Sequence, residues 1–266
     1  MTTASLRVTP AQAFRQGLTL AWRGLVALKN SPGQILGFVM QPLVMIVIFV
    51  YVFGGAAAAG DRAGVVMYAV PGVLVQAALI GTTATGLNLH TDLGNGVFDR
   101  IRSLPIARSA PLTGRIVADA VGMAVSVLAA LIVGWTVGFR IQTDIPRTIA
   151  AIALVVAFAM AVSCMSAYVG LIARNAASIQ FMAFGLFLPL TMGSNAYIVP
   201  EYVPGWLQGW IAVNPVSHLV SSLRGLLLGG EHAEGLGTDL AWTGLWALVF
   251  VAVFAPLAVR AYKRKI

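Results

Sequence analysis

Charged side chains are scarce in this sequence of 266 residues. The chain has 17 Lys and Arg and nine Asp and Glu, which together make up 10% of its residues. A soluble domain carries roughly 25% charged residues, and so few charges cannot cover the surface of a soluble protein of this length. The composition therefore excludes a soluble globular enzyme, a disordered protein and a nucleic-acid-binding domain.

Residues that carry familiar chemistry are also sparse. The single cysteine, Cys164, excludes a disulfide framework and any cysteine-based metal cluster. Only Lys29, Lys263 and Lys265 are lysines, and none follows a glycine-rich turn, so the chain carries no P-loop ATPase. The three histidines lie in separate segments, and neither H-E-x-x-H nor G-x-S-x-G occurs. We find no catalytic constellation and predict no metal site and no cofactor bound by this chain.

Long apolar runs are what the sequence has in abundance. A membrane span needs about 20 mostly apolar residues. Seven long runs contain no Asp, Glu, Lys or Arg. One of them, 202–223, is too polar and too interrupted by Pro and Gly for a helix that faces lipid. The remaining runs predict six spans, at about 34–54, 66–88, 116–138, 148–171, 177–197 and 240–260.

The charges between these spans predict the orientation in the membrane. If the N-terminus is inside, thirteen Lys and Arg and three Asp lie on the inner side, against four Arg and six acidic residues outside. An excess of basic residues in the loops marks the cytoplasmic side. We therefore expect both termini in the cytoplasm, and no N-terminal signal peptide is recognisable.

Three segments outside the spans have amphipathic patterns. Residues 10–30 predict a helix lying in the cytoplasmic interface, with packing on a soluble partner as the alternative. In the loop 89–112, Val97, Ile101 and Leu104 predict an apolar stripe on a short helix, which is too short to be stable without a partner surface. A solvated loop is the alternative. Residues 199–230 predict two short extracellular helices, either a re-entrant hairpin or a purely interfacial pair.

Polar residues recur on one face of two predicted spans. In the fifth span the face comprises Gln180, Phe184, Phe187, Thr191 and Asn195, and in the second it comprises Gln76, Thr83 and His90. Because a polar side chain facing lipid is costly, these faces should point at protein or at a cavity. We interpret the residues other than His90 as candidates for a substrate pathway; hydrogen bonding between packed helices is the alternative.

Several motifs, in this order along the chain, resemble the ABC-2 type permeases, and within them the daunorubicin/doxorubicin-resistance-type branch. They are Pro42 through Phe53-Gly54, Tyr68-x-x-Pro71-Gly72, the loop from Gly96 to Pro105, Pro204-Gly-Trp-Leu, Asn214-Pro215 and Leu223-Arg224-Gly-Leu-Leu-Leu-Gly229. The resemblance covers essentially the whole chain. It implies one all-α transmembrane domain over 1–266, with a cytoplasmic coupling helix after the second span. The coupling residues carried over are Gly96, Val97, Phe98, Asp99, Arg100, Ile101, Arg102 and Leu104.

The resemblance also implies partners and a function. The chain would be the permease subunit of an ABC exporter in a bacterial plasma membrane, paired with a second copy or a homologue. Two separate ATPase subunits would bind the ATP and Mg, and the cargo would be an amphipathic drug, lipid or natural product. An ion-coupled secondary transporter and an integral-membrane enzyme are the alternatives; the first would need ionisable groups in the spans, and none lies at a predicted midpoint. Residue chemistry alone leaves open the direction of transport and the identity of the partner permease.

Overall fold

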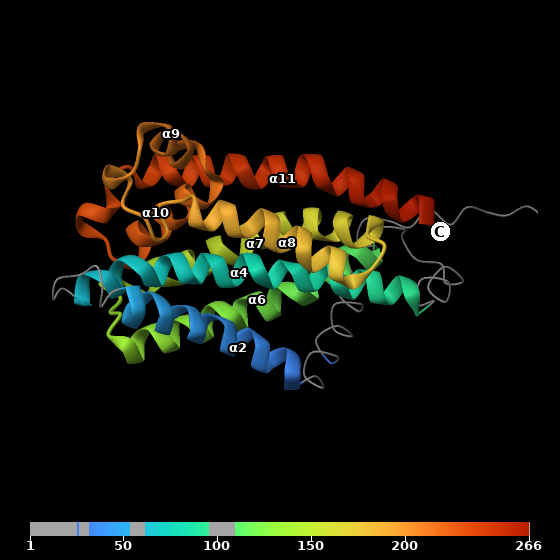
Figure 1. Cartoon of the computed structure of the whole chain (residues 1–266), viewed down its shortest axis with the longest axis horizontal. Coiled ribbons are helices and arrows are strands. Elements are labelled where there is room, and N and C mark those ends of the chain that lie inside the picture. The colour runs from blue at the N-terminus through green and yellow to red at the C-terminus, as the bar shows by residue number, and fades with distance from the viewer. Residues whose placement is uncertain (1–25, 27–31, 54–61, 96–109, 266) are drawn as a thin grey trace, which may run out of the picture.

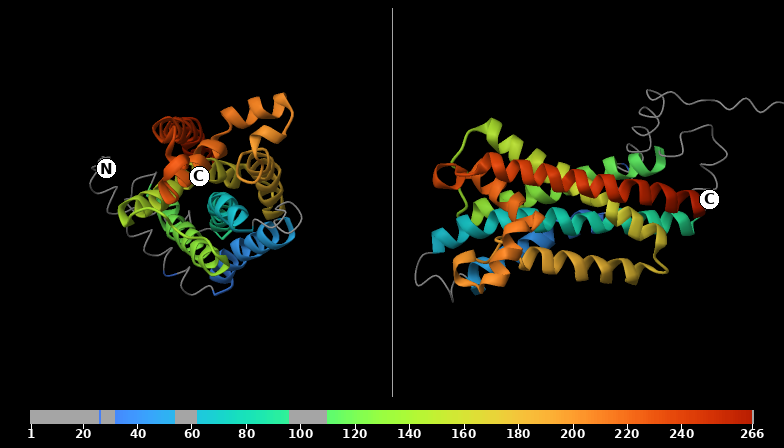
Figure 2. Two further views of the ribbon diagram at one scale, coloured as in Figure 1. Left: turned by 90° about the vertical axis from the view of Figure 1, so that its left-hand side faces the viewer. Right: turned by 90° about the horizontal axis from the view of Figure 1, so that it is seen from above.

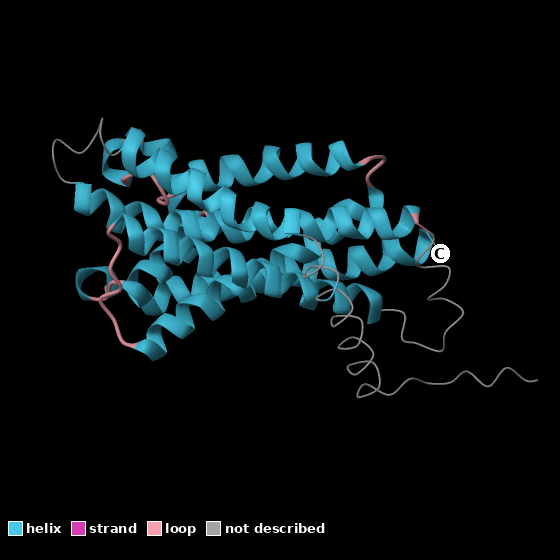
Figure 3. Cartoon of the chain, turned by 90° about the horizontal axis from the view of Figure 1, so that it is seen from below, coloured by secondary structure: helices cyan, strands magenta, loops and turns pink. Residues whose placement is uncertain are grey.

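The protein is a bundle of helices that run roughly parallel to one long axis (Figure 1). The computed structural model describes residues 26, 32–53, 62–95 and 110–265. Within these residues the chain forms only helices, turns and loops (Figure 3). Apart from Val26, the predicted interfacial helix 10–30 lies outside the described residues, as do the coupling residues Gly96 to Leu104.

Six helices or helical segments coincide with the six predicted spans. Their bounds are α2 Pro32–Val47 with the π-helix η1 Ile48–Phe53, α4 Arg62–Gly94, α6 Ala110–Val137, α7 Ile145–Ile172, α8 Ala176–Met192 and α11 Leu236–Lys265. Among the described residues, four stretches are long and apolar enough to cross a membrane: Ala63–Gly94, Arg115–Val137, Ile145–Ile172 and Leu236–Arg264. Val39–Tyr51 and Ala176–Met192 are apolar but shorter.

The fifth predicted span, 177–197, extends too far. Helix α8 ends at Met192, where Gly193 caps it by donating its backbone N–H to the carbonyl of Pro189. The Asn214 side chain then donates to the carbonyl oxygens of Leu190 and Gly193, each at 2.9 Å. These contacts satisfy carbonyls at the helix end, so the chain turns there and Asn195 lies beyond the helix.

Helix α4 occupies the centre of the bundle. It contacts α2, α6, α7, α8 and α10, and Figure 2 shows it surrounded by the other helices in the end-on view. In its most apolar 18-residue stretch 67% of residues are buried, against 11% for α11. A helix that is apolar around its whole circumference needs such cover, whereas α11 keeps a wide surface for lipid.

Small residues allow α4 and α7 to approach at backbone distance. A Cβ on Gly86 would lie 2.5 Å from the carbonyl oxygen of Ser166, and one on Gly170 would collide with the carbonyl of Gly86. Beside this contact, the hydroxyls of Thr82 and Ser166 form a 3.1 Å hydrogen bond between the helices. Small residues and interhelical hydrogen bonds are the usual means of association for helices in lipid.

Gly134 and Gly138, a spacing that permits close packing of helices, have different roles in α6. A Cβ on Gly134 would lie 2.9 Å from Val70 of α4, so this glycine does serve close approach. Gly138 instead adopts a φ of 118° and ends the helix.

Two short helices, α9 Gly205–Val213 and α10 Pro215–Leu227, lie at one end of the bundle, as predicted for residues 199–230 (Figure 1). Pro204 precedes α9, and Asn214 caps α10 by accepting a hydrogen bond from the N–H of Val216. The apolar face of α10 is buried; it comprises Val216, Leu219, Val220, Leu223 and Leu227. Helix α10 is therefore a packed part of the bundle, while α9 keeps Trp206 exposed.

We predict that Gly170→Ala lowers the free energy of unfolding by about 1–3 kcal/mol, because the added methyl group forces α4 and α7 apart. The measurement is the thermal unfolding midpoint of the purified protein in detergent. Gly185→Ala is the matched control, since no atom lies within 4 Å of the added Cβ, and it should leave the midpoint unchanged or raise it. Equal midpoints for Gly170→Ala and the native protein would contradict the close approach.

Candidate functional site

A cavity of about 450 Å³ lies between α2, α4 and α8. Ligand pockets usually have volumes of about 300–1,000 Å³. The described residues of its wall combine amides and hydroxyls with aromatic and aliphatic side chains, and none of them is charged. The lining residues are Gln41, Met45, Gln76, Ile80, Thr83, Gln180, Ala183, Phe184, Phe187, Leu188 and Thr191.

The cavity brings together six of the seven residues predicted for a substrate pathway. Gln76 and Thr83 of α4 face Gln180, Phe184, Phe187 and Thr191 of α8 across it. The polar faces of the two helices therefore do meet at a cavity. Phe187 and Thr191 are buried, whereas Phe184 is 65% exposed, so the cavity opens to the surroundings of the single chain.

Asn195 was wrongly assigned to the same helical face. It lies in the turn after α8, where its side-chain N–H donates to Ser221 of α10 at 2.8 Å. Its backbone N–H donates to Ser217 at 3.3 Å. Asn195 thus connects the turn to α10 and does not line the cavity.

Tyr197 and Phe49 lie at the end of the cavity that is nearer α10. Their rings stack with centroids 3.7 Å apart and an interplanar angle of 3°. The Tyr197 hydroxyl donates a hydrogen bond to the side-chain oxygen of the lining residue Gln76. Phe49 belongs to the π-helix η1, a rare geometry that is often found at functional sites. These contacts join η1, α4 and the turn after α8.

Arg224 of α10 forms a second polar contact at this end, and only 5% of it is exposed. Its guanidinium donates to the backbone carbonyls of Tyr68 at 2.9 Å, Asn195 at 2.8 Å and Ala196 at 3.2 Å. The guanidinium carbon also lies 3.6 Å from the centroid of the Tyr68 ring. We call Tyr68, Asn195, Ala196 and Arg224 the arginine clasp.

The arginine clasp holds a buried cation by means of carbonyl dipoles. Burial lowers the pKa of the Arg224 guanidinium, and its contacts with Tyr68 oppose that effect. A guanidinium presents several donors in a fixed plane, so it can bind carbonyls of two segments at once. In this way Arg224 fixes the turn after α8 and the beginning of α4 against α10.

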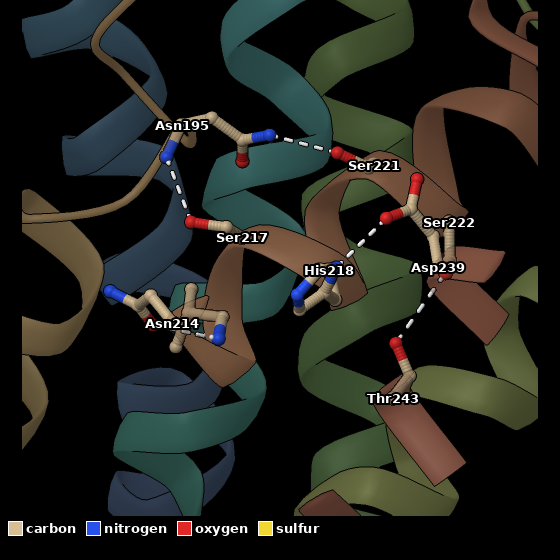
Figure 4. A network of polar contacts seen from close by, with 9 residues as sticks. Asn195, Asn214, Ser217, His218, Ser221, Ser222, Asp239 and Thr243 are labelled. Atoms are coloured by element: carbon tan, nitrogen blue, oxygen red, sulfur yellow. Dashed lines mark hydrogen bonds and ion pairs between the residues drawn. The ribbon is translucent and has the colours of Figure 1, made fainter. Parts of the chain in front are cut away.

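A network of polar side chains continues from the clasp along α10 (Figure 4). Nδ1 of His218 lies 2.9 Å from Oδ1 of Asp239 in α11, and the imidazole ring stacks on Trp242 with ring centroids 5.4 Å apart. The hydroxyl oxygens of Ser222 and of Thr243 in α11 are 3.5 Å apart and form a hydrogen bond. These contacts give the histidine a packed structural role and attach α10 to the beginning of α11.

Sequence reasoning counted Arg224 as an extracellular charge and as part of a family motif but predicted no contact for it, and it missed Gln41. The motifs Tyr68-x-x-Pro71-Gly72 and Leu223-Arg224-Gly meet in the arginine clasp, and Asn214 lies beside it. For Gln41 the signal was a single amide in an otherwise apolar span, next to Pro42. In the part of the chain that the structure describes, no group of three or more His, Cys, Asp or Glu is placed to hold a metal ion.

Comparisons with known proteins point to one family. The family described as ABC-2 type transporter matches residues 15–228. A Streptomyces coeruleorubidus protein named daunorubicin resistance ABC transporter permease protein DrrB1 is 34% identical over 263 residues, 98% of this chain and 91% of that protein. The Mycobacterium tuberculosis H37Rv proteins named as the probable doxorubicin resistance permease DrrC and the doxorubicin resistance permease DrrB are 26% and 25% identical. DrrC matches 86% of this chain and 82% of its own length, and DrrB matches 95% and 90%.

We predict that Arg224→Lys lowers the free energy of unfolding by about 1–3 kcal/mol. The compact ammonium still has to be buried, but it cannot reach the carbonyls of Tyr68, Asn195 and Ala196 together. Thermal unfolding of the purified protein measures the effect. Arg147→Lys is the control, because Arg147 forms an exposed pair with Asp144 at 3.6 Å and should tolerate the change within about 0.5 kcal/mol. Similar small shifts for both variants would show that the clasp contributes little.

Proposed function

Because this chain belongs to the ABC-2 type transporter family, we propose that it exports amphipathic aromatic compounds through the cavity between α2, α4 and α8. The protein is a multi-pass membrane permease, a transport component and not an enzyme. The observation that carries the export of drugs is the similarity, over nearly the full length, to a permease named for daunorubicin resistance. The cavity supports this assignment, since it offers aromatic surface and hydrogen-bonding groups in an apolar setting.

The cavity lies at the edge of the single chain, which supports assembly with a second permease. Helix α8 exposes Phe181, Met182, Phe184 and Leu188 beside the opening. We propose that a second copy or a close homologue covers this face and completes the pathway. Oligomers of identical chains are commonly built in this symmetric way.

The sequence contains no phosphate-binding loop, which supports a source of energy outside this chain. We propose that two separate ATPase subunits bind ATP and Mg and contact the permease through the loop 89–112. The proposed contact residues are Gly96, Val97, Phe98, Asp99, Arg100, Ile101, Arg102 and Leu104. Helix α4 runs directly into this loop, so a displacement of the loop would reach Thr83 and Gln76 along a single rigid element.

The proposed setting is a bacterial plasma membrane, crossed six times with both termini in the cytoplasm. The charge distribution between the helices supports this orientation. Helices α9 and α10 then lie at the extracellular end as a re-entrant pair, with Trp206 and Tyr202 exposed where aromatic residues favour the membrane interface. An ion-coupled transporter is the alternative, but none of the described residues that line the cavity is an ionisable group of the kind such coupling uses.

We predict that Phe184→Ala changes substrate preference. Loss of one aromatic contact should lower transport of an aromatic amphiphile about two- to tenfold relative to an aliphatic one. The measurement is ATP-dependent uptake of both compounds into inside-out vesicles containing the assembled transporter. Trp206→Ala is the control, since it also removes an exposed aromatic side chain, from α9 and outside the cavity wall. Unchanged relative transport in Phe184→Ala would remove this side chain from the pathway.

Phe98→Asp should weaken co-purification with the ATPase subunit and lower substrate-stimulated ATP hydrolysis. A buried apolar side chain of this size contributes roughly 1.5–3 kcal/mol, which a carboxylate would forfeit. Membrane insertion should be normal, because the change touches no span. Glu234→Gln is the control: Glu234 lies on the proposed extracellular side, so this variant should bind the ATPase as the native protein does. Normal binding and transport by Phe98→Asp would rule out this loop as the coupling element.

A further inference from the structure

Gln41 is a lining residue of the cavity whose side-chain amide nitrogen is buried without a hydrogen-bond partner. It lies in α2 immediately before Pro42. An amide that is buried and unpaired is unfavourable unless it finds an acceptor. Four other buried side-chain atoms in the described residues lack partners: those of Thr85, Asn195, His218 and Trp246. None of these four residues lines the cavity, so only Gln41 combines an unpaired donor with a space for a ligand.

The surroundings of Gln41 limit what can satisfy it. Of the other two amides in the wall, Gln76 already accepts a hydrogen bond from Tyr197 through its side-chain oxygen. The remaining wall offers the aromatic rings of Phe184 and Phe187, aliphatic side chains, hydroxyls and Gln180, all of them uncharged. An ionised group entering this cavity would lose its hydration without meeting an opposite charge.

We propose that Gln41 recognises the cargo by donating a hydrogen bond from its amide nitrogen to a carbonyl oxygen on an uncharged aromatic part of the molecule. This inference rests on the proposed function and assigns a specificity-determining residue to its pathway. Phe184 and Phe187 contact the ring system, and Gln41 distinguishes a ring that carries carbonyl groups from the same ring without them. A site built to donate a hydrogen bond discriminates strongly against a ligand that leaves the donor unpaired.

The test compares two flat ligands that share a ring skeleton and differ in carbonyl groups. Radiolabelled anthraquinone carries two carbonyls, and radiolabelled anthracene carries none. Binding is measured to the permease assembled with its ATPase in lipid nanodiscs, with binding to empty nanodiscs subtracted. Gln41→Met removes the donor and keeps an unbranched side chain of similar length. Gln142→Met makes the same exchange at an exposed position outside the cavity.

We expect Gln41→Met to weaken anthraquinone binding about three- to tenfold and to leave anthracene binding within about twofold. Gln142→Met should change neither. Unchanged anthraquinone binding in Gln41→Met would overturn the proposal, as would an equal loss for both ligands or the absence of specific anthraquinone binding to the native complex. Gln41→Leu serves as a second donor-free variant if Gln41→Met does not assemble.

The failure of this inference is distinguishable from the failure of the proposed function. If Gln41→Met binds anthraquinone as the native complex does, the inference about Gln41 fails. The exporter assignment still stands if the native complex takes up an aromatic amphiphile in an ATP-dependent way. No ATP-dependent uptake of any amphiphile by the native complex would contradict the exporter assignment itself.

Discussion

A helix that is apolar on every side must be covered on every side, and α4 imposes this constraint on the whole bundle. Helices α2, α6, α7, α8 and α10 all pack against it. The close contacts at Gly86 and Gly134 bring α7 and α6 to its surface, where larger residues would hold them away. The few polar residues on α4 then have to meet protein or a cavity, and they determine where the two functional features of this molecule lie.

Those two features differ in whether the hydrogen-bond donor at their centre is satisfied. In the arginine clasp, a buried cation finds carbonyl oxygens of Tyr68, Asn195 and Ala196, and its role is to hold the end of the bundle together. In the cavity wall, the amide nitrogen of Gln41 finds no partner within the described residues. A satisfied buried group stabilises one arrangement, whereas an unsatisfied group beside an open volume favours the binding of a ligand. This difference supports a structural role for one end of α4 and a binding role for its middle.

The sequence was sufficient for features that depend on local pattern. Apolar runs located the helices, and Asn214-Pro215 located the beginning of α10. Helical spacing placed Gln76 and Thr83 on one face and Gln180, Phe184, Phe187 and Thr191 on another, and these two faces meet. The contribution of Gln41 depends on where α2 packs against α4 and α8, which no local pattern reveals. Asn195 was assigned incorrectly because a contact with Asn214, distant in sequence, ends α8 early.

The most direct test of the central claim is to map where a transported compound contacts the permease. A photoreactive aromatic amphiphile would be crosslinked to the assembled transporter during ATP-dependent uptake, and the labelled residues identified by mass spectrometry. The account predicts labels on the cavity faces of α2, α4 and α8, at or next to Gln41, Gln76 and Phe184, and fewer labels when an unlabelled substrate competes. Labels confined to the exposed surfaces of α7 and α11, with none on the cavity wall, would contradict it.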